Sequence, residues 1–235
     1  MKYEFTGKTM EYKGITLRQI KMCNTDAVGG WIEKEENLSQ KGDCFVYHNA
    51  KVYGNAKVYD NASIYDNAKV YDNASIYGNA MVYDNAMVYD NASIYDNASV
   101  CDNAKVYDNA SIYDNARACD NASIYGNASI YENALISENA TVNGTAIVSR
   151  DTIIKGEDKI KNGIVNCEYK QVDYYTCSNA RGITVITTLD DIALFNVDCQ
   201  ILITKEEFLD RIYNTSGGVE RNPHREFYLK ILSLY

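Results

Sequence analysis

Apolar and polar positions recur with a period of six residues between Val46 and Val148. The consensus unit reads Asn-Ala-x-Val/Ile-Tyr-Asp, and Ala118 is the only departure from Val or Ile at its position. Ala and Val/Ile are two residues apart, which places both side chains on one face of a strand and x and Tyr on the other. Asp and Asn tolerate the left-handed backbone region, so the pair suits a corner. The pattern predicts four strand residues and a two-residue corner in each unit.

A second period of 18 residues appears because every third unit is most alike. Lys51, Lys69 and Lys105 share one column at position x, whereas a second column is filled by Ser. Three units per turn predict a triangular coil with three flat faces and with Ala and Val/Ile inside. About six coils fit between residues 43 and 150. At ~4.8 Å per coil the rod would be roughly 30 Å long.

An aliphatic residue followed four positions later by a small one, as in Val52 and Ala56 or Val88 and Ala92, is a recognisable motif. It resembles the hexapeptide-repeat, left-handed parallel β-helix superfamily. The resemblance implies an all-β dominated fold, namely a left-handed parallel β-helix of about six three-sided coils of 18 residues. It implies no activity, since this scaffold carries enzymes and inert rods alike.

The flanking segments lack the repeat and define the predicted domain boundaries. Residues 1–42 are predicted to be an N-terminal β capping segment, 43–155 the hexapeptide-repeat β-helix, and 156–235 a small α+β C-terminal domain. Repeat folds cover their open ends with atypical segments, and Trp31, Ile32 and Leu38 are the predicted apolar plug.

The C-terminal domain is predicted to combine short strands with two helices. The strands are expected at residues 164–165, 172–175, 183–188 and 192–203. A capping box, Thr204-Lys205-Glu206-Glu207, should open one helix, and Asn222-Pro223 should open a second.

A longer motif gives a second resemblance. GGWIEKEENLS at residues 29–39, followed by VYDNA and VYGNA units, is similar to uncharacterised phage and prophage proteins of Gram-positive bacteria. The similarity implies a phage-borne origin and supplies no activity.

Composition narrows the setting in which the protein works. Hydrophobic content is 46% without a long apolar run, which predicts no membrane span. The opening residues have no apolar stretch typical of a secretory signal. The seven Cys residues form an odd set without a CxxC pair, which favours reduced thiols. We therefore predict the cytoplasm of a bacterial host. Cys101 and Cys119 replace Tyr in one column, and either a disulfide or plain substitution would account for them.

The net charge of −9 is concentrated in the repeat, where 13 residues are acidic and 6 are basic. An acidic rod does not predict nucleic-acid binding, because neutralising phosphates requires Lys and Arg. It could attract a basic protein surface. Asp66, Asp84, Asp102 and Asp120 share one corner column. That column is open to three interpretations: a cation-binding ridge, mimicry of a phosphate backbone, or a solvated edge that deters aggregation.

One face of the predicted rod has no charge outside its corners except Lys57. We call it the serine–tyrosine face; its residues are Ser75, Ser93, Ser111 and Ser129 with Tyr59, Tyr77, Tyr95, Tyr113 and Tyr131. Tyr covers contact area at low entropic cost, so the face is a candidate for protein binding or self-association. Alternatively, the Tyr rings only stabilise neighbouring strands.

Catalytic and cofactor chemistry has little support in the chain. The hexapeptide-repeat acyltransferases use a His base, and this chain has only His48, at a corner, and His224. The sequence contains neither an HxxxH or CxxC metal pair nor a phosphate-binding Gly-rich loop, so we predict no metal and no cofactor. Arg211, Arg221, His224 and Arg225 form a possible anion-binding cluster near a predicted helix start.

These observations predict a non-enzymatic binding or scaffolding protein that uses a rigid, acidic, Tyr-rich β-helix and a C-terminal docking domain. The resemblance to phage proteins implies that it binds, and could inhibit, a host protein such as a defence factor. A dimer or trimer is expected, because the hexapeptide-repeat proteins it resembles often associate as trimers. Two alternatives remain: an acyltransferase relative that uses His48 or His224, and a sponge that binds a nucleotide or another small anion.

Overall fold

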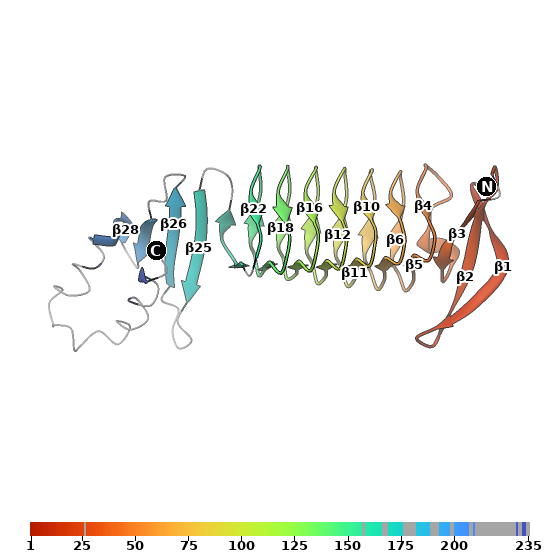
Figure 1. The fold of residues 1–235 in the computed structure, drawn as a ribbon, viewed down its shortest axis with the longest axis horizontal. Helices are drawn as coiled ribbons and strands as arrows, with labels where there is room; N and C mark the ends of the chain where they lie inside the picture. Colours follow the sequence, from red (N-terminus) through yellow and green to blue (C-terminus); the bar gives the residue numbers. More distant parts are fainter. Residues whose placement is uncertain are drawn as a thin grey trace. The chain divides into compact units, whose positions relative to one another are not determined.

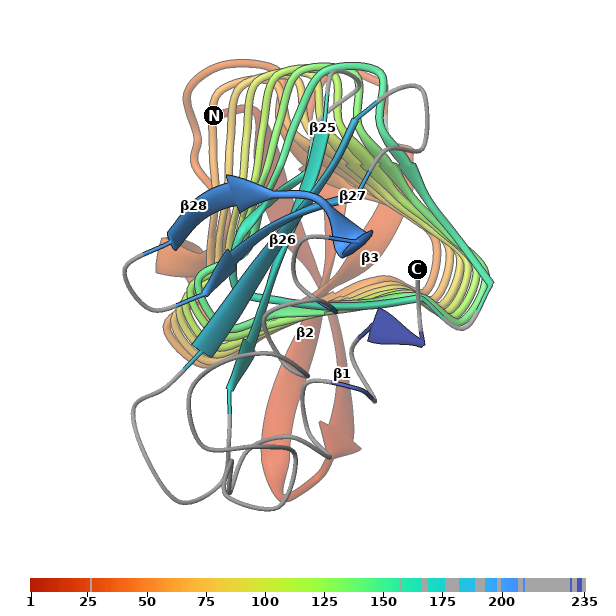
Figure 2. The same ribbon diagram turned by 90° about the vertical axis from the view of Figure 1, so that its left-hand side faces the viewer.

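The fold is given by a computed structural model that describes residues 1–25, 27–156, 158–165, 169–175, 182–188, 193–197, 200–206, 209, 229, 232 and 233. The chain divides into two compact units, Met1–Ile160 and Lys161–Tyr235. The first unit is a parallel β-solenoid whose coils stack side by side (Figure 1). Viewed along the stack, the coils superimpose with three corners (Figure 2).

Three sheets form the sides of the solenoid, and each coil contributes one short strand to each sheet. Sheet A contains β1 (Tyr3–Tyr12), β2 (Ile15–Met22), β3 (Val28–Ile32), β5 (Lys51–Val52), β8 (Lys69–Val70), β11 (Met87–Val88), β14 (Lys105–Val106), β17 (Ser123–Ile124), β20 (Thr141–Asn143) and β23 (Lys159–Lys161). Sheet B contains, in the first unit, β6 (Lys57–Val58), β9 (Ser75–Ile76), β12 (Ser93–Ile94), β15 (Ser111–Ile112), β18 (Ser129–Ile130) and β21 (Ile147–Val148). Sheet C contains β4 (Phe45–Val46), β7 (Ser63–Ile64), β10 (Met81–Val82), β13 (Ser99–Val100), β16 (Arg117–Ala118), β19 (Leu135–Ile136) and β22 (Ile153–Ile154).

The seven strands of sheet C correspond to about seven coils, one more than the sequence pattern predicts. The prediction of six coils missed residues that continue the core without the six-residue motif. Ile32 in β3 pairs in register with Val52, and Ile154 in β22 pairs with Ile136. The solenoid therefore extends past both ends of the visible repeat.

Parallel hydrogen bonds between coils use three backbone N–H groups of each six-residue unit. Lys51 N donates to Ala68 O at 2.9 Å, Tyr53 N to Val70 O at 3.1 Å, and Asn55 N to Asp72 O at 2.6 Å. Only the x and Val/Ile residues have strand geometry, so the strands are shorter than the predicted four residues. The bonds flanking them nevertheless keep the whole unit in register with the next coil.

The corners require a left-handed residue directly after each Tyr. Asp occupies most of these positions, and its φ there lies between 54° and 58°. Asp and Gly accept this conformation more readily than other residues, which explains why they recur there. The Asn that follows forms ladders along the edge; Asn55 Nδ2, for example, donates to Asn73 Oδ1 at 3.2 Å.

The core of the solenoid is the predicted column of Ala and Val/Ile. Ala50 to Ala146 and Val46 to Val148 are fully buried at every repeat position. Burying one Val or Ile side chain contributes roughly 1.5–3 kcal/mol. Ala118 lies in the same column between Val100 and Ile136, so the coil that contains it has the smallest core side chain.

The N-terminal segment closes the first coil. Strands β1 and β2 pair antiparallel and continue sheet A through β3, and a 3₁₀ turn follows at Glu35–Asn37 (η1). The Tyr3 hydroxyl donates to Leu38 O at 2.8 Å. Ile32 and Leu38 are fully buried, in agreement with the predicted plug. Trp31, in contrast, is only half-buried beside Lys51, because it occupies the outward-facing x position.

The second unit contains antiparallel strands in the order β24 (Ile164–Val165), β25 (Tyr169–Tyr175), β26 (Gly182–Thr188), β27 (Ala193–Val197) and β28 (Gln200–Ile203). These strands fall close to the predicted ones. Among the described residues the chain is all-β with almost no helix. The two helices of the predicted α+β domain lie mainly outside the described residues and stay a prediction.

Candidate functional site

The serine–tyrosine face lies on sheet B. Its Ser column is in register along the sheet, because Ser75 pairs with Ser93, Ser93 with Ser111, and Ser111 with Ser129. All four side chains are half-buried. The face therefore presents a straight row of hydroxyl groups along four consecutive coils, with no loop interrupting it.

The five Tyr residues of this face form one continuous stack. Successive ring centroids are 4.8–5.0 Å apart and the ring planes are within 2–9° of parallel. This distance equals the spacing of the strands that hold the rings. The ring faces cover one another, so a partner would meet ring edges and hydroxyl groups.

Burial raises the pKa of four hydroxyl groups of this face, those of Tyr59, Tyr77, Tyr95 and Tyr113. It is the largest cause that raises the pKa of Tyr95 to about 12, and the neighbouring Tyr113 and Tyr77 add to it. The pKa values of Tyr59, Tyr77 and Tyr113 are raised as well, again mainly by burial. Tyr and Ser hydroxyl groups are already uncharged at neutral pH, so the face carries uncharged hydrogen-bonding groups there.

A second Tyr stack lies on sheet A. It runs through Tyr53, Tyr71, Tyr89, Tyr107 and Tyr125, with centroids 4.8–5.0 Å apart. The adjacent column differs from that of sheet B because it carries Lys residues. Burial, followed by the proximity of Lys69, lowers the pKa of Lys51. Because stacks occur on both faces, ring stacking itself accounts for the Tyr repeat. What distinguishes the serine–tyrosine face is its uncharged Ser column.

The acidic corners have a structural role that the sequence did not reveal. Asp120 Oδ2 accepts a hydrogen bond from Glu138 N at 3.0 Å, and Asp108 Oδ2 accepts one from Gly126 N at 3.1 Å. Each of these carboxylates bonds the corner residue of the next coil. This contact favours a structural interpretation of the acidic columns. Among the described residues, no group of three acidic corner side chains comes together as a metal site would require.

His48 occupies a corner position with φ 52°. Its Nδ1 atom lies 3.0 Å from Asp66 Oδ1, and its side chain is 63% exposed. From the sequence, His48 is one of two candidates for an acyltransferase base. The structure places it on an exposed corner, paired with a carboxylate of the next coil.

The predicted anion-binding cluster lies outside the described residues. Arg211, Arg221, His224 and Arg225 are therefore not placed, and the cluster stays a prediction.

Two surface grooves lie beside the N-terminal cap. The smaller, of about 410 Å³, is lined by Lys13, Ile15, Glu33, Tyr53, Gly54, Tyr71 and Asp72.

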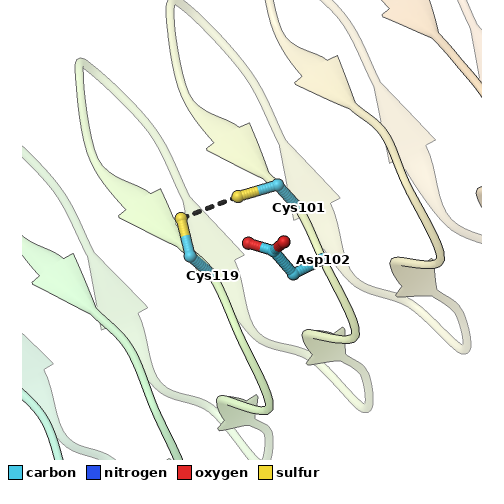
Figure 3. A group of neighbouring side chains, drawn as sticks. All are labelled: Cys101, Asp102 and Cys119. Carbon is cyan, nitrogen blue, oxygen red and sulfur yellow. Dashed lines mark hydrogen bonds between the residues drawn. The ribbon is translucent and has the colours of Figure 1, made fainter.

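A third group, on sheet C, combines two thiols with a carboxylate. Cys101 and Cys119 follow β13 and β16, and their sulfur atoms face each other 2.7 Å apart beside Asp102 (Figure 3). One ligand atom from each residue lies within 4.8 Å of the other two, the only such group among the described residues. Arg117 is close enough to Cys119 for the thiolate to raise the pKa of its guanidinium. A neighbouring cation opposes the binding of a metal ion, so we do not assign one.

Comparison with known families supports the fold and adds no activity. A family model described as the YdcK β-solenoid repeat matches residues 74–90. Together with the stacked coils, this match makes the chain a β-solenoid repeat protein. No curated protein matched the chain. Within the described part of the chain, no helix is long and apolar enough to cross a membrane.

Proposed function

We propose that this protein is a non-enzymatic binding or scaffolding protein and that its serine–tyrosine face binds a protein partner. The observation that carries the proposal is the in-register column of four Ser residues beside an unbroken stack of five Tyr residues. A surface rich in Tyr and Ser is typical of antibody binding sites, where Tyr supplies contact area and Ser supplies adaptable hydrogen bonds.

The rigidity of the solenoid supports the same proposal. Association costs the ordering of side chains and loops at an interface. On this face the rings already stack and the backbone is already bonded to the neighbouring coils. A partner would therefore meet a preorganised surface, and little binding energy would be lost in ordering it.

We further propose that the partner is a host protein and that binding inhibits it, as a phage-borne origin would favour. The chain is also proposed to form a dimer or trimer. Its coils are proposed to be left-handed, since the repeat resembles the left-handed hexapeptide-repeat superfamily. An acidic corner next to the face would favour a partner with basic groups around a neutral contact area.

Charged substitutions in the Ser column test the proposed interface. Ser93→Glu with Ser111→Glu places two carboxylates in its centre, where a partner would have to desolvate them. Ser123→Glu is the matched control, because Ser123 is half-buried at the same position of the repeat but lies on sheet A.

Native mass spectrometry of tagged protein recovered from host-cell lysate gives the readout. We expect the double variant to lose a partner or subunit that the wild-type protein and the Ser123→Glu variant both retain. Retention of the same complex by the double variant would exclude this face as the interface. Circular dichroism should show unchanged β-structure in all three proteins.

A further inference from the structure

Cys101 and Cys119 occupy equivalent places in two consecutive coils. The residues before them pair in register, Ser99 with Arg117 and Val100 with Ala118. Neighbouring strands are ~4.8 Å apart, within the ~4.4–6.8 Å between Cα atoms that a disulfide spans. The sulfur atoms are already 2.7 Å apart (Figure 3). Forming a bond of ~2.05 Å therefore requires only a small side-chain movement.

The two thiols are not equivalent. The Cys101 thiol donates its hydrogen bond to Cys119 Sγ. This bond is the largest cause that lowers the pKa of Cys119, and the Arg117 guanidinium lowers it further. The same bond, with burial, raises the pKa of Cys101. Because a thiolate is the reactive form, Cys119 is the attacking sulfur of the pair.

The pair lies where the solenoid core is smallest. Ala118 precedes Cys119 and stands where all the remaining six-residue units of the repeat have Val or Ile. In a solenoid each coil is held only by its neighbours. A covalent link between these two coils would reinforce the place where apolar packing contributes least.

We propose that Cys101 and Cys119 form an oxidisable thiol pair that hydrogen peroxide converts into a disulfide between two coils. The Cys119 thiolate attacks one peroxide oxygen, the O–O bond breaks, and the departing hydroxide takes up the proton that Cys119 released. Cys101 sulfur then attacks the sulfenic acid on Cys119. The S–S bond forms, the S–O bond breaks, and the hydroxyl leaves with the Cys101 proton as water. Two thiols lose two electrons, the peroxide gains two, and two water molecules form.

Burial selects a small oxidant. Cys101 is 3% exposed and Cys119 is 8% exposed, so little of either residue reaches solvent. Hydrogen peroxide is small and uncharged and is suited to this opening. A bulky disulfide such as oxidised glutathione has less access to sulfur atoms buried to this extent.

The test uses the full-length protein, reduced and then treated with one equivalent of hydrogen peroxide. Trypsin cleaves after Lys69, Lys105, Arg117 and Arg150, so Cys101 and Cys119 fall in separate peptides, 70–105 and 118–150, without another Cys. We expect peptide mass spectrometry under non-reducing conditions to find these two peptides joined in most molecules. Reduction should separate them.

Single variants assign the roles. Cys101→Ser should leave a sulfenic acid on Cys119, which dimedone traps once urea has unfolded the protein, whereas Cys119→Ser should abolish the reaction at Cys101. Cys23→Ser is the matched control because Cys23 is exposed, and it should keep the full yield of the cross-link. The proposal fails if 70–105 and 118–150 remain separate while Cys23 oxidises. It also fails if the reduced protein carries a stoichiometric metal ion that zincon or native mass spectrometry detects at this pair.

Discussion

The Tyr columns of sheets B and C occupy the same position of the six-residue repeat, but only the column on sheet B forms a continuous ring stack. On sheet B five rings stack without interruption from Tyr59 to Tyr131. On sheet C the stack of Tyr47 on Tyr65 does not continue to Tyr83, and the next two positions of the column are Cys101 and Cys119. The backbone hydrogen bonds between coils are the same in both columns. Tyr95 N donates to Ile112 O at 3.0 Å, and Cys101 N donates to Ala118 O at 2.9 Å.

This comparison separates what builds the solenoid from what gives each face its chemistry. Coil-to-coil hydrogen bonds and the buried Ala and Val/Ile residues hold both columns in the same register. The outward residue is therefore free to vary. Tyr at this position in successive coils produces a rigid uncharged surface. Cys at the same position in two successive coils produces a reactive pair.

The largest expected effect is on the Tyr stacks at high pH. Burial raises the pKa of Tyr95 and Tyr107 to about 12 from an ordinary value of 10.0. Between these values the unfolded chain has released protons that the folded chain still holds, so stability falls as the pH rises from 10 to 12. Phenolate absorbance and far-ultraviolet circular dichroism should change together in this range.

Tyr95→Phe is the control for the alkaline transition. It keeps a ring in the stack and removes one titrating hydroxyl, so the transition should move to higher pH. Phenolate formation at position 95 near pH 10, measured as the absorbance difference between the wild-type protein and Tyr95→Phe, would contradict a buried, stacked hydroxyl group.

Oxidation of the thiol pair should have the next largest effect. Closing an 18-residue loop by the Cys101–Cys119 disulfide should stabilise the folded protein by roughly 3 kcal/mol, mainly by restricting the unfolded chain. The melting temperature of the peroxide-treated protein should therefore exceed that of the reduced protein. The same treatment of the Cys119→Ser variant should leave the melting temperature unchanged, and equal values for both wild-type forms would contradict a staple at this position.

Removing a ring from the middle of the sheet B stack sharpens the comparison further. Tyr95 stacks on Tyr77 and on Tyr113, each at 4.9 Å. Each stacked pair is worth about 0.5–1.5 kcal/mol, so Tyr95→Ala should lose about 1–3 kcal/mol from stacking alone. Tyr131 is at the end of the stack and contacts only the Tyr113 ring, so Tyr131→Ala should reduce the free energy of unfolding by about half as much. Equal losses in urea unfolding would show that the rings do not act as a stack.

The smallest effects are expected at the corners. Asp114 has φ 55°, and its Oδ2 accepts a hydrogen bond from Glu132 N at 3.2 Å. Asp114→Ala removes the hydrogen-bond acceptor and places in the left-handed backbone region a residue that disfavours it. The free energy of unfolding should fall by about 1–2 kcal/mol. Asp114→Asn keeps an acceptor and tolerates the backbone, so it should change the free energy of unfolding by less than about 0.5 kcal/mol. A larger loss for Asn than for Ala would show that the charge, and not the corner geometry, is what matters.

The solenoid could be predicted because its pattern repeats in the chain itself. The separation of two between Ala and Val/Ile defines the buried side, and the 18-residue period defines which residues are neighbours. The extra coil was missed because Ile32 and Ile154 extend the core without the Asn-Ala motif. Spatial continuation of a core does not require continuation of its sequence pattern.

The sequence predicts which residues are adjacent in the solenoid better than it predicts the chemistry of the sites that they form. The 18-residue spacing places Cys101 next to Cys119, but it does not give the 2.7 Å approach of their sulfur atoms or the nearby Arg117. Bonds from the corner carboxylates to the next coil also depend on side-chain direction, which periodicity does not specify. The Arg211, Arg221, His224 and Arg225 cluster lies beyond the described residues, so its role rests on the sequence alone.

Site-specific photo-cross-linking tests the proposed interface most directly. Tyr95 and Tyr107 are both half-buried members of stacks in the middle of the rod, on sheets B and A respectively. Each is replaced by p-benzoylphenylalanine, and the protein is irradiated in the host cell. The account predicts a discrete protein adduct from position 95 and none from position 107. An adduct from position 107 alone, or none from either position, would contradict the assignment of the serine–tyrosine face as the binding surface.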